Sequence, residues 1–123
     1  DNMPPPAGAG NYADVSAANM VPYTIKGYND NFRGPAPSGT YEANELGVFD
    51  LAGNVSEWTN DYYSVELHRK TLIDPLGPNQ GDYYVIRGSN YTHGRFSELR
   101  WTFRDYGSDP RPDVGFRIAR YIE

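Results

Sequence analysis

The sequence predicts a loop-dominated α+β domain with several short antiparallel strands and little helix. Glycine and proline are frequent, with 13 and 10 among 123 residues, and both interrupt regular structure. No stretch keeps the apolar spacing of a long amphipathic helix, and no internal repeat is present. The clearest strand signal is the aromatic and β-branched run at residues 83–88, which stops at a glycine.

The first third of the chain predicts mostly irregular structure. Residues 1–10 hold three consecutive prolines, which exclude helix and favour an extended lead-in. Residues 11–19 are small and polar and predict loop or a short helical turn. We expect a short edge strand at residues 21–25, because the proline there cannot donate to a central ladder. Residues 27–39 predict loop from their Gly, Asn, Asp and Pro content, and the polar residues 40–46 predict a turn.

A sharp bend is expected at a Gly-Asn corner within residues 47–58. A short apolar run enters this corner, and Gly and Asn both tolerate the positive φ of a tight turn. Asp50 and Glu57 flank the corner and bring two carboxylates near its backbone carbonyls. Oxygen ligands on a tight turn suit a hard cation such as calcium. From spacing alone, the alternative is an ordinary turn with two solvated acids.

The remaining strands are expected in the second half of the chain. The aromatic-rich residues 57–63 predict a strand that leaves the corner, with Trp58 as a core anchor. A second strand pair is expected at residues 99–103 and 115–118. Between these two segments, residues 106–112 predict a loop rich in Gly, Pro and Asp.

Size and composition limit the function. At 123 residues the chain is one domain at most, and we expect it to be a fragment or processed piece, since it starts at Asp1 without a signal peptide. The formal net charge of −5 argues against nucleic-acid binding, which needs clustered Lys and Arg. No apolar run approaches the roughly 20 residues that span a bilayer. Cysteine is absent, which excludes disulfides and thiolate chemistry within this chain.

Several motifs occur in order along nearly the whole chain. Residues 50–58 read DLAGNVSEW, residues 85–91 read VIRGSNY, and residues 114–120 read VGFRIAR. Together with residues 10–14, 30–37 and 99–104, these segments resemble the formylglycine-generating enzyme (sulfatase-modifying factor) family. The resemblance implies the loop-rich formylglycine-generating-enzyme fold, a relative of the C-type lectin fold. Ala43 and Ser56 depart from that family, which usually has proline and a large aromatic residue at these positions.

The resemblance also implies a domain about twice as long, whose C-terminal half contains the matched motifs. Residues 1–123 are therefore interpreted as the C-terminal portion of a single sulfatase-modifying-factor-like domain. We expect the missing N-terminal half to be supplied by the parent protein or by another chain.

Two structural calcium sites are implied by the same resemblance. Calcium would pin loops that no helix or broad sheet holds. At the first site the alternative is an Asx turn, which Asn and Asp form without a metal. The residues that match the family's ligands are Asn11, Tyr12, Asp30 and Phe32 at the first site, and Asp50, Gly53, Val55 and Glu57 at the second.

The resemblance does not carry the family's oxidase chemistry with it. The resembled enzymes convert a substrate cysteine to formylglycine with two copper-binding cysteines, which lie between the RGGS and LR motifs. The corresponding residues 91–98 contain no cysteine, nor does the rest of the chain. Soft thiolates select Cu(I), and nothing here replaces them, so neither copper nor formylglycine-generating activity is expected.

We therefore expect a non-catalytic module that binds protein or peptide in a periplasmic or extracellular bacterial protein. The resemblance puts residues 90–98 and 105–113 near the site where the enzymes hold substrate peptide, although Phe96 and Trp101 could equally be core. Two other functions stay open: an enzyme of the family that uses a metal or residues outside this chain, and a lectin-like carbohydrate-binding domain. The candidate ligand-binding residues are Tyr91, His93, Arg95, Phe96, Trp101, Arg104 and Tyr106.

Overall fold

The computed structural model of the protein describes residues 3–65, 73 and 77–120. Within these residues there is one 3-10 helix, η1 (Val15–Ala17). The four strands are β1 (Ser56–Tyr62), β2 (Tyr84–Arg87), β3 (Arg104–Gly107) and β4 (Val114–Gly115). The expected loop-rich chain with little helix is confirmed, as are the strands predicted at residues 57–63 and 83–88. None of the helical structure in the described residues is long and apolar enough to cross a membrane.

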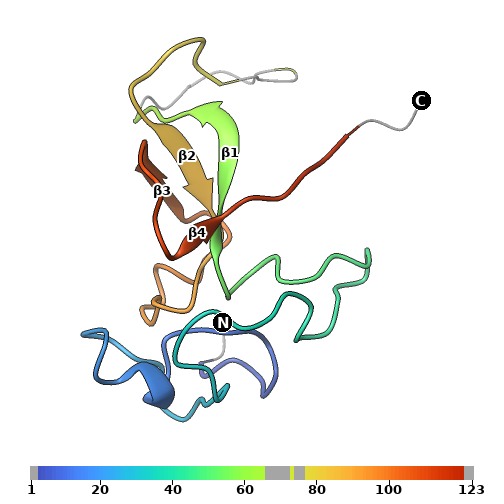
Figure 1. The fold of residues 1–123 in the computed structure, drawn as a ribbon, viewed down its shortest axis with the longest axis vertical. Helices are drawn as coiled ribbons and strands as arrows, with labels where there is room; N and C mark the ends of the chain where they lie inside the picture. The colour runs from blue at the N-terminus through green and yellow to red at the C-terminus, as the bar shows by residue number, and fades with distance from the viewer. Residues whose placement is uncertain (1–2, 66–72, 74–76, 121–123) are drawn as a thin grey trace.

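The elements form two regions, one above the other in Figure 1. The sheet region consists of the four strands in the order β3-β2-β1-β4 and the turns that join them. The loop region consists of residues 3–54 and 88–103 and contains η1. The two regions meet where β1 leaves the Gly-Asn corner and where β2 ends. After β4 the chain runs away from both regions (Figure 1).

The sheet is mixed: two of its three strand pairings are antiparallel, as expected, and the third is parallel. β2 pairs antiparallel with β1, where Trp58 lies opposite Ile86, and antiparallel with β3, where Ile86 lies opposite Asp105. β4 joins the other edge of β1 in parallel, with Ser56 opposite Val114. The pairing of β1 with β2 is irregular between Trp58 and Tyr62.

The expected edge strand at residues 21–25 does not form. Ile25 is buried, and its backbone N–H donates to the carbonyl of Ala13 at 2.7 Å. Pro22 has no N–H to extend this single bond into a ladder. The segment therefore packs as a loop, with Ile25 in the core.

The expected strand pair at residues 99–103 and 115–118 is also wrong. The N–H of Phe103 donates to the carbonyl of Arg100 at 2.9 Å, which closes a turn. The guanidinium of Arg87 donates to the carbonyl of Trp101 at 2.6 Å and to that of Phe103 at 2.9 Å, so these carbonyls are already used. The strand begins only afterwards, as β3, and takes in the first two residues of the predicted 106–112 loop. Beyond β4 the backbone leaves β1 (Figure 1), so residues 116–118 find no partner strand.

The interior of the loop region contains both apolar and polar side chains. Its apolar cluster consists of Tyr12, Ile25 and Tyr28, with Leu99 packed against it. The hydroxyl of Tyr28 donates to the carbonyl of Gly10 at 2.6 Å. Buried polar side chains lie beside it and need hydrogen-bond partners there. The largest fully buried side chains in the described residues are Ile86, Asn11, Asn90, Asp14 and Ser56.

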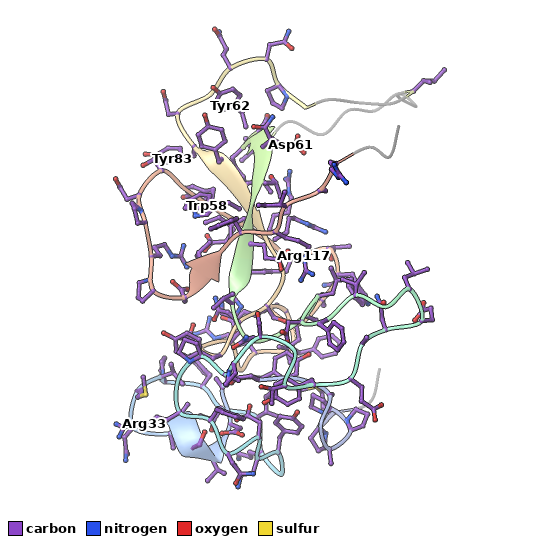
Figure 2. All side chains as sticks on the ribbon, turned by 45° about the vertical axis from the view of Figure 1, so that its right-hand side comes forward. Arg33, Trp58, Asp61, Tyr62, Tyr83 and Arg117 are labelled. Carbon is purple, nitrogen blue, oxygen red and sulfur yellow. The ribbon has the colours of Figure 1, made fainter. Side chains whose placement is uncertain are left out.

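Aromatic side chains cover the sheet region. Trp58 is only half-buried, which revises its predicted role as a core anchor: its ring packs against Gly107, where an added Cβ would lie 3.1 Å from the indole. Tyr62 stacks on Tyr84 with ring centroids 4.8 Å apart. Figure 2 shows Trp58 and Tyr62 along the sheet, Tyr62 at the end away from the loop region. These rings shield the strands without closing a deep core.

Candidate functional site

The Gly-Asn corner joins the segments of the loop region. Asn54 has a φ of 64°, as expected for a sharp bend, and its side chain is buried. Its Oδ1 accepts the N–H of Ala36 at 2.8 Å, and its Nδ2 donates to the carbonyl of Ala36 at 3.1 Å. Its backbone N–H donates to the carbonyl of Asn11 at 2.8 Å, and its carbonyl accepts the N–H of Tyr91 at 2.9 Å. One residue therefore connects three other parts of the chain.

The structure brings together the residues of the first predicted calcium site. The Asp30 carboxylate accepts the N–H of Tyr12 and the N–H of Phe32, each at 2.8 Å. The second of these bonds is the Asx turn that was the alternative at this site. Fully buried Asp14 accepts the backbone N–H of Asp30 and the hydroxyl of Ser16. Burial raises the pKa of the Asp30 carboxyl, and repulsion from Asp14 raises it further.

Asn11, next to Tyr12, has an unsatisfied oxygen. Its side chain is fully buried, and its Nδ2 donates to the carbonyl of Gly34 at 2.9 Å, which orients the amide. Its Oδ1 has no hydrogen-bond partner among the described residues. A buried acceptor without a partner is destabilising, and a cation would satisfy it.

The chemistry of these donors fits calcium better than a transition metal. In the described part of the chain, no three His, Cys, Asp or Glu side chains gather as a metal site. Amide, carbonyl and carboxylate oxygens are instead the ligands that calcium prefers. The ion pairs among the described residues involve Arg111 and Arg117, and none of them reaches Asp14 or Asp30.

The second predicted calcium site already contains a positive charge. Asp50 Oδ2 accepts the N–H of Gly39 at 2.7 Å, and its Oδ1 is buried without a hydrogen-bond partner among the described residues. The Glu57 carboxylate, however, pairs with the guanidinium of Arg117 at 2.6 Å. Arg117 also donates to the carbonyl of Phe49 at 2.8 Å. The two predicted sites therefore differ, because in the described part of the chain no cationic side chain pairs with the carboxylate of the first site.

Two of the predicted ligand-binding residues lie inside the molecule. Tyr91 is buried below the corner. His93 is half-buried, with its ring edge against Phe103 at a centroid distance of 5.2 Å, and its Nδ1 accepts the N–H of Asn90 at 3.3 Å. Burial lowers the pKa of the His93 imidazole, while the carboxylate of Glu98 opposes this shift. The other predicted residues reach the surface, but in separate places.

Arg95, Arg104 and Tyr106 do not share a surface with the predicted aromatic pair Phe96 and Trp101. The Arg95 guanidinium covers the ring of Tyr23, 3.7 Å from its centroid. Arg104 and Tyr106 belong to β3, where both contact the ring of Tyr63. The predicted set is therefore distributed over the interior, the loop region and the sheet region.

A groove of about 1020 Å³ runs between the N-terminal segment, the corner and the turn at residues 96–102. Phe96 and Trp101 line it and are 49% and 73% exposed, so the alternative that they belong to the core is wrong. Further apolar groups in its lining are Met3, Pro5, Pro6, Tyr12, Leu51 and Leu99. Its polar lining consists of Arg87, Ser89, Arg100 and Thr102.

Much of this lining was not predicted. Residues 3–6 were expected only to lead into the domain, and their sequence carries no signal of a site. Arg87 and Arg100 do belong to the matched VIRGSNY and LR motifs, which is the one signal that could have selected them. Tyr12 belongs both to the groove lining and to the first predicted calcium site.

Comparisons with known proteins agree with the motif resemblance. The sulfatase-modifying factor enzyme 1-like domain family (FGE-sulfatase) matches residues 7–122. The chain therefore belongs to this family. It is 44% identical over 93 residues to the serine/threonine-protein kinase Pkn1 of Chlamydia trachomatis, covering 71% of this chain and 15% of that protein. It is 37% identical over 80 residues to the formylglycine-generating enzyme of Bos taurus, covering 65% of this chain and 21% of the enzyme.

A bacterial formylglycine-generating enzyme, from Thermomonospora curvata, is 36% identical over 66 residues, covering 50% of this chain and 22% of the enzyme. The chain thus spans between 15% and 22% of the length of these relatives. It contains no cysteine, which argues against formylglycine-generating oxidase activity in this chain.

Proposed function

We propose that this chain is a non-catalytic sulfatase-modifying-factor-like domain that binds an extended segment of protein or peptide in its groove, with calcium holding the loops. The observation that carries the proposal is the open apolar groove, lined by exposed Phe96 and Trp101, in a family domain without cysteine. Aromatic side chains in such grooves are frequent anchors for partners.

The groove suits a chain segment better than a small metabolite. Its volume of about 1020 Å³ is at the upper end of the range usual for small-molecule sites, roughly 300–1,000 Å³. Its walls come from three separate parts of the sequence, and it is open to solvent. An extended segment could lay successive side chains along these walls, as in other peptide-recognition grooves.

The names of the relatives favour a binding function over a single reaction that all of them share. This region is similar both to part of a protein named a kinase and to part of proteins named formylglycine-generating enzymes. A domain shared by proteins named for different activities is more easily explained by binding than by one chemistry.

Calcium at Asn11 and Asp30 would support this function by holding the backbone of a residue that lines the groove. The unsatisfied Oδ1 of Asn11 and the Asp30 carboxylate, which forms no ion pair among the described residues, are suitable ligands, with the carbonyls of Tyr12 and Phe32 completing the predicted set. Tyr12 also lines the groove, so a cation that fixes its backbone would fix part of the wall. The second predicted site is retained as a weaker proposal, because Arg117 already neutralises Glu57.

Selection from a random dodecapeptide library, displayed on phage and panned against the immobilised chain, would test the proposal. We expect enriched peptides whose affinity, measured by fluorescence anisotropy, falls about tenfold or more in Phe96→Ala. Phe116→Ala is the matched control, because Phe116 is 76% exposed but does not line the groove. Equal loss in both variants, or no enrichment at all, would contradict the proposed function. Binding on a glycan array instead would favour the lectin-like alternative.

A further inference from the structure

We infer that the groove selects peptide segments in which acidic residues accompany apolar ones. This inference rests on the proposed function and goes one step further, because it specifies the ligand. The carboxylates of the ligand would face Arg87 and Arg100, and its apolar side chains would pack on the aromatic walls.

The charge of the groove is opposite to that of the whole protein. The chain has a formal net charge of −5, with 16 acidic residues against 11 Lys and Arg. Among the described residues, the groove lining nevertheless contains two arginines and no Asp or Glu. An acidic protein with a locally basic groove favours acidic ligands there and repels basic ones.

Arg87 supplies a fixed positive charge. Its guanidinium donates to the carbonyls of Trp101 and Phe103, at 2.6 and 2.9 Å, which holds it against the turn. These partners are neutral, and no carboxylate of the described residues forms an ion pair with Arg87. Within the described part of the chain, no ion pair therefore neutralises the charge of Arg87 beside the groove.

Arg100 supplies a second, more adaptable charge at the rim. It is exposed, and among the described residues its guanidinium makes no ion pair. A planar guanidinium can bind a carboxylate through two parallel hydrogen bonds. Arg111 and Arg117, in contrast, are each paired with carboxylates of the protein itself.

The rest of the lining favours a peptide ligand over a simple anion. Most of the lining residues are apolar, including Leu51, Phe96, Leu99 and Trp101. A phosphate or a nucleic-acid backbone would leave these groups without contacts, whereas a peptide with mixed apolar and acidic side chains would use both parts. The geometry therefore favours a peptide over other anionic ligands.

The composition of peptides selected by the wild-type chain tests this inference, with Arg100→Glu and Arg33→Glu panned in parallel. Arg33 is the matched control: it does not line the groove and lies beside η1, at the end of the loop region away from the sheet (Figure 2). We expect Asp and Glu to be enriched by the wild-type chain and by Arg33→Glu. Arg100→Glu should lose that enrichment and weaken the best wild-type peptide about tenfold, and Arg100→Gln about threefold.

The outcomes separate the inference from the proposed function. Enriched peptides without an acidic excess, or with one that Arg100→Glu leaves unchanged, would overturn the inference while the peptide-binding function stands. A pool with no enrichment would overturn both. For the selected peptide, raising the salt concentration should weaken binding to the wild-type chain more than to Arg100→Gln, since salt screens the exposed charge pair.

Discussion

The loop region and the sheet region are held together by different means. In the sheet region, backbone hydrogen bonds join short strands, and rings such as Tyr62 and Tyr84 stack over them. In the loop region, buried side chains of Asn11, Asp14 and Asn54 bind the backbone of distant segments. A ladder spreads its stability over many similar bonds, whereas the loop region depends on a few polar atoms that nothing nearby can replace.

This difference has consequences for function. The groove belongs largely to the loop region, so its shape depends on the same few polar contacts. Substitutions of equal size should therefore cost much more stability there than in the sheet region.

Gly53→Ala should be the most destabilising substitution in this series. Gly53 has a φ of +83°, and an added Cβ would lie 2.9 Å from the backbone oxygen of Asn11. Backbone atoms at the corner cannot move aside easily, so we expect a loss of about 3 kcal/mol or more in the free energy of unfolding, measured by urea denaturation.

Two glycines control this experiment. Gly8 has a similar φ of +77° with no atom within 4 Å of an added Cβ, so Gly8→Ala should lose only about 1 kcal/mol from backbone strain. In the sheet region, the Cβ added by Gly107→Ala would lie against the tip of the Trp58 ring, and this side chain can shift to make room. A Gly107→Ala variant as unstable as Gly53→Ala would contradict the contrast between the regions.

Asn54→Ala should cost about 2–3 kcal/mol. It removes the bonds to both backbone groups of Ala36 and leaves those groups buried without partners. Asn60→Ala is the control in the sheet region, since Asn60 is exposed on β1, and it should change stability by less than about 0.5 kcal/mol. Similar losses in the free energy of unfolding for both variants, measured by urea denaturation, would show that the corner does not contribute more to stability than an exposed strand position.

Tyr106→Ala should cost about 1 kcal/mol, because the ring stacks on Tyr63 with centroids 4.4 Å apart and meets Tyr83 edge-on at 5.3 Å. Figure 2 shows Tyr83 on the sheet, away from the loop region. Tyr106→Phe keeps the ring and should be close to the wild type in thermal unfolding. A larger loss in Tyr106→Phe than in Tyr106→Ala would mean that the hydroxyl matters and the stacking does not.

The smallest effect is a dependence of stability on pH through His93. Because the pKa of His93 is lowered in the folded protein, the unfolded chain takes up a proton more readily. The contribution of His93 to the free energy of unfolding should be fully present above the ordinary histidine pKa of about 6.5. It should fall by less than about 1 kcal/mol as the pH decreases below that value. The raised pKa of Asp30 acts in the opposite direction, but in a lower window above the ordinary aspartate value of about 3.9.

His93→Gln should flatten this dependence between about pH 7 and pH 5.5 in thermal unfolding. The only other histidine of the chain is His68, which lies outside the described residues, and His68→Gln serves as the control. If the pH dependence persists in His93→Gln and disappears in His68→Gln, the titrating residue is His68 and the prediction is wrong.

The sequence predicted the two strands that carry their own signal. β1 and β2 contain the aromatic and β-branched residues that favour strands in isolation. β3 has the sequence RDYG, with little apolar alternation, and β4 has only two residues. Both depend on pairing with distant strands, which local patterns do not encode.

The candidate site was predictable to a similar extent. The motif resemblance selected Asn11, Asp30 and Asp50, and two of these side chains contain a buried oxygen without a hydrogen-bond partner among the described residues. The groove was not predictable, because its walls come from residues 3–6, the corner and the turn at 96–102. Only the folded chain brings these segments together. The predicted ligand-binding set was dispersed for the same reason.

We propose that a cation completes the loop region, and thermal unfolding in calcium and in EDTA tests this claim most directly. Asp30→Ala removes a proposed ligand, and Asp61→Ala removes an exposed carboxylate on β1, labelled in Figure 2. Calcium at about a hundred times its Kd should stabilise the wild type and Asp61→Ala by roughly 2.7 kcal/mol relative to EDTA, and leave Asp30→Ala unchanged. A wild-type transition at the same temperature in both buffers would contradict the claim.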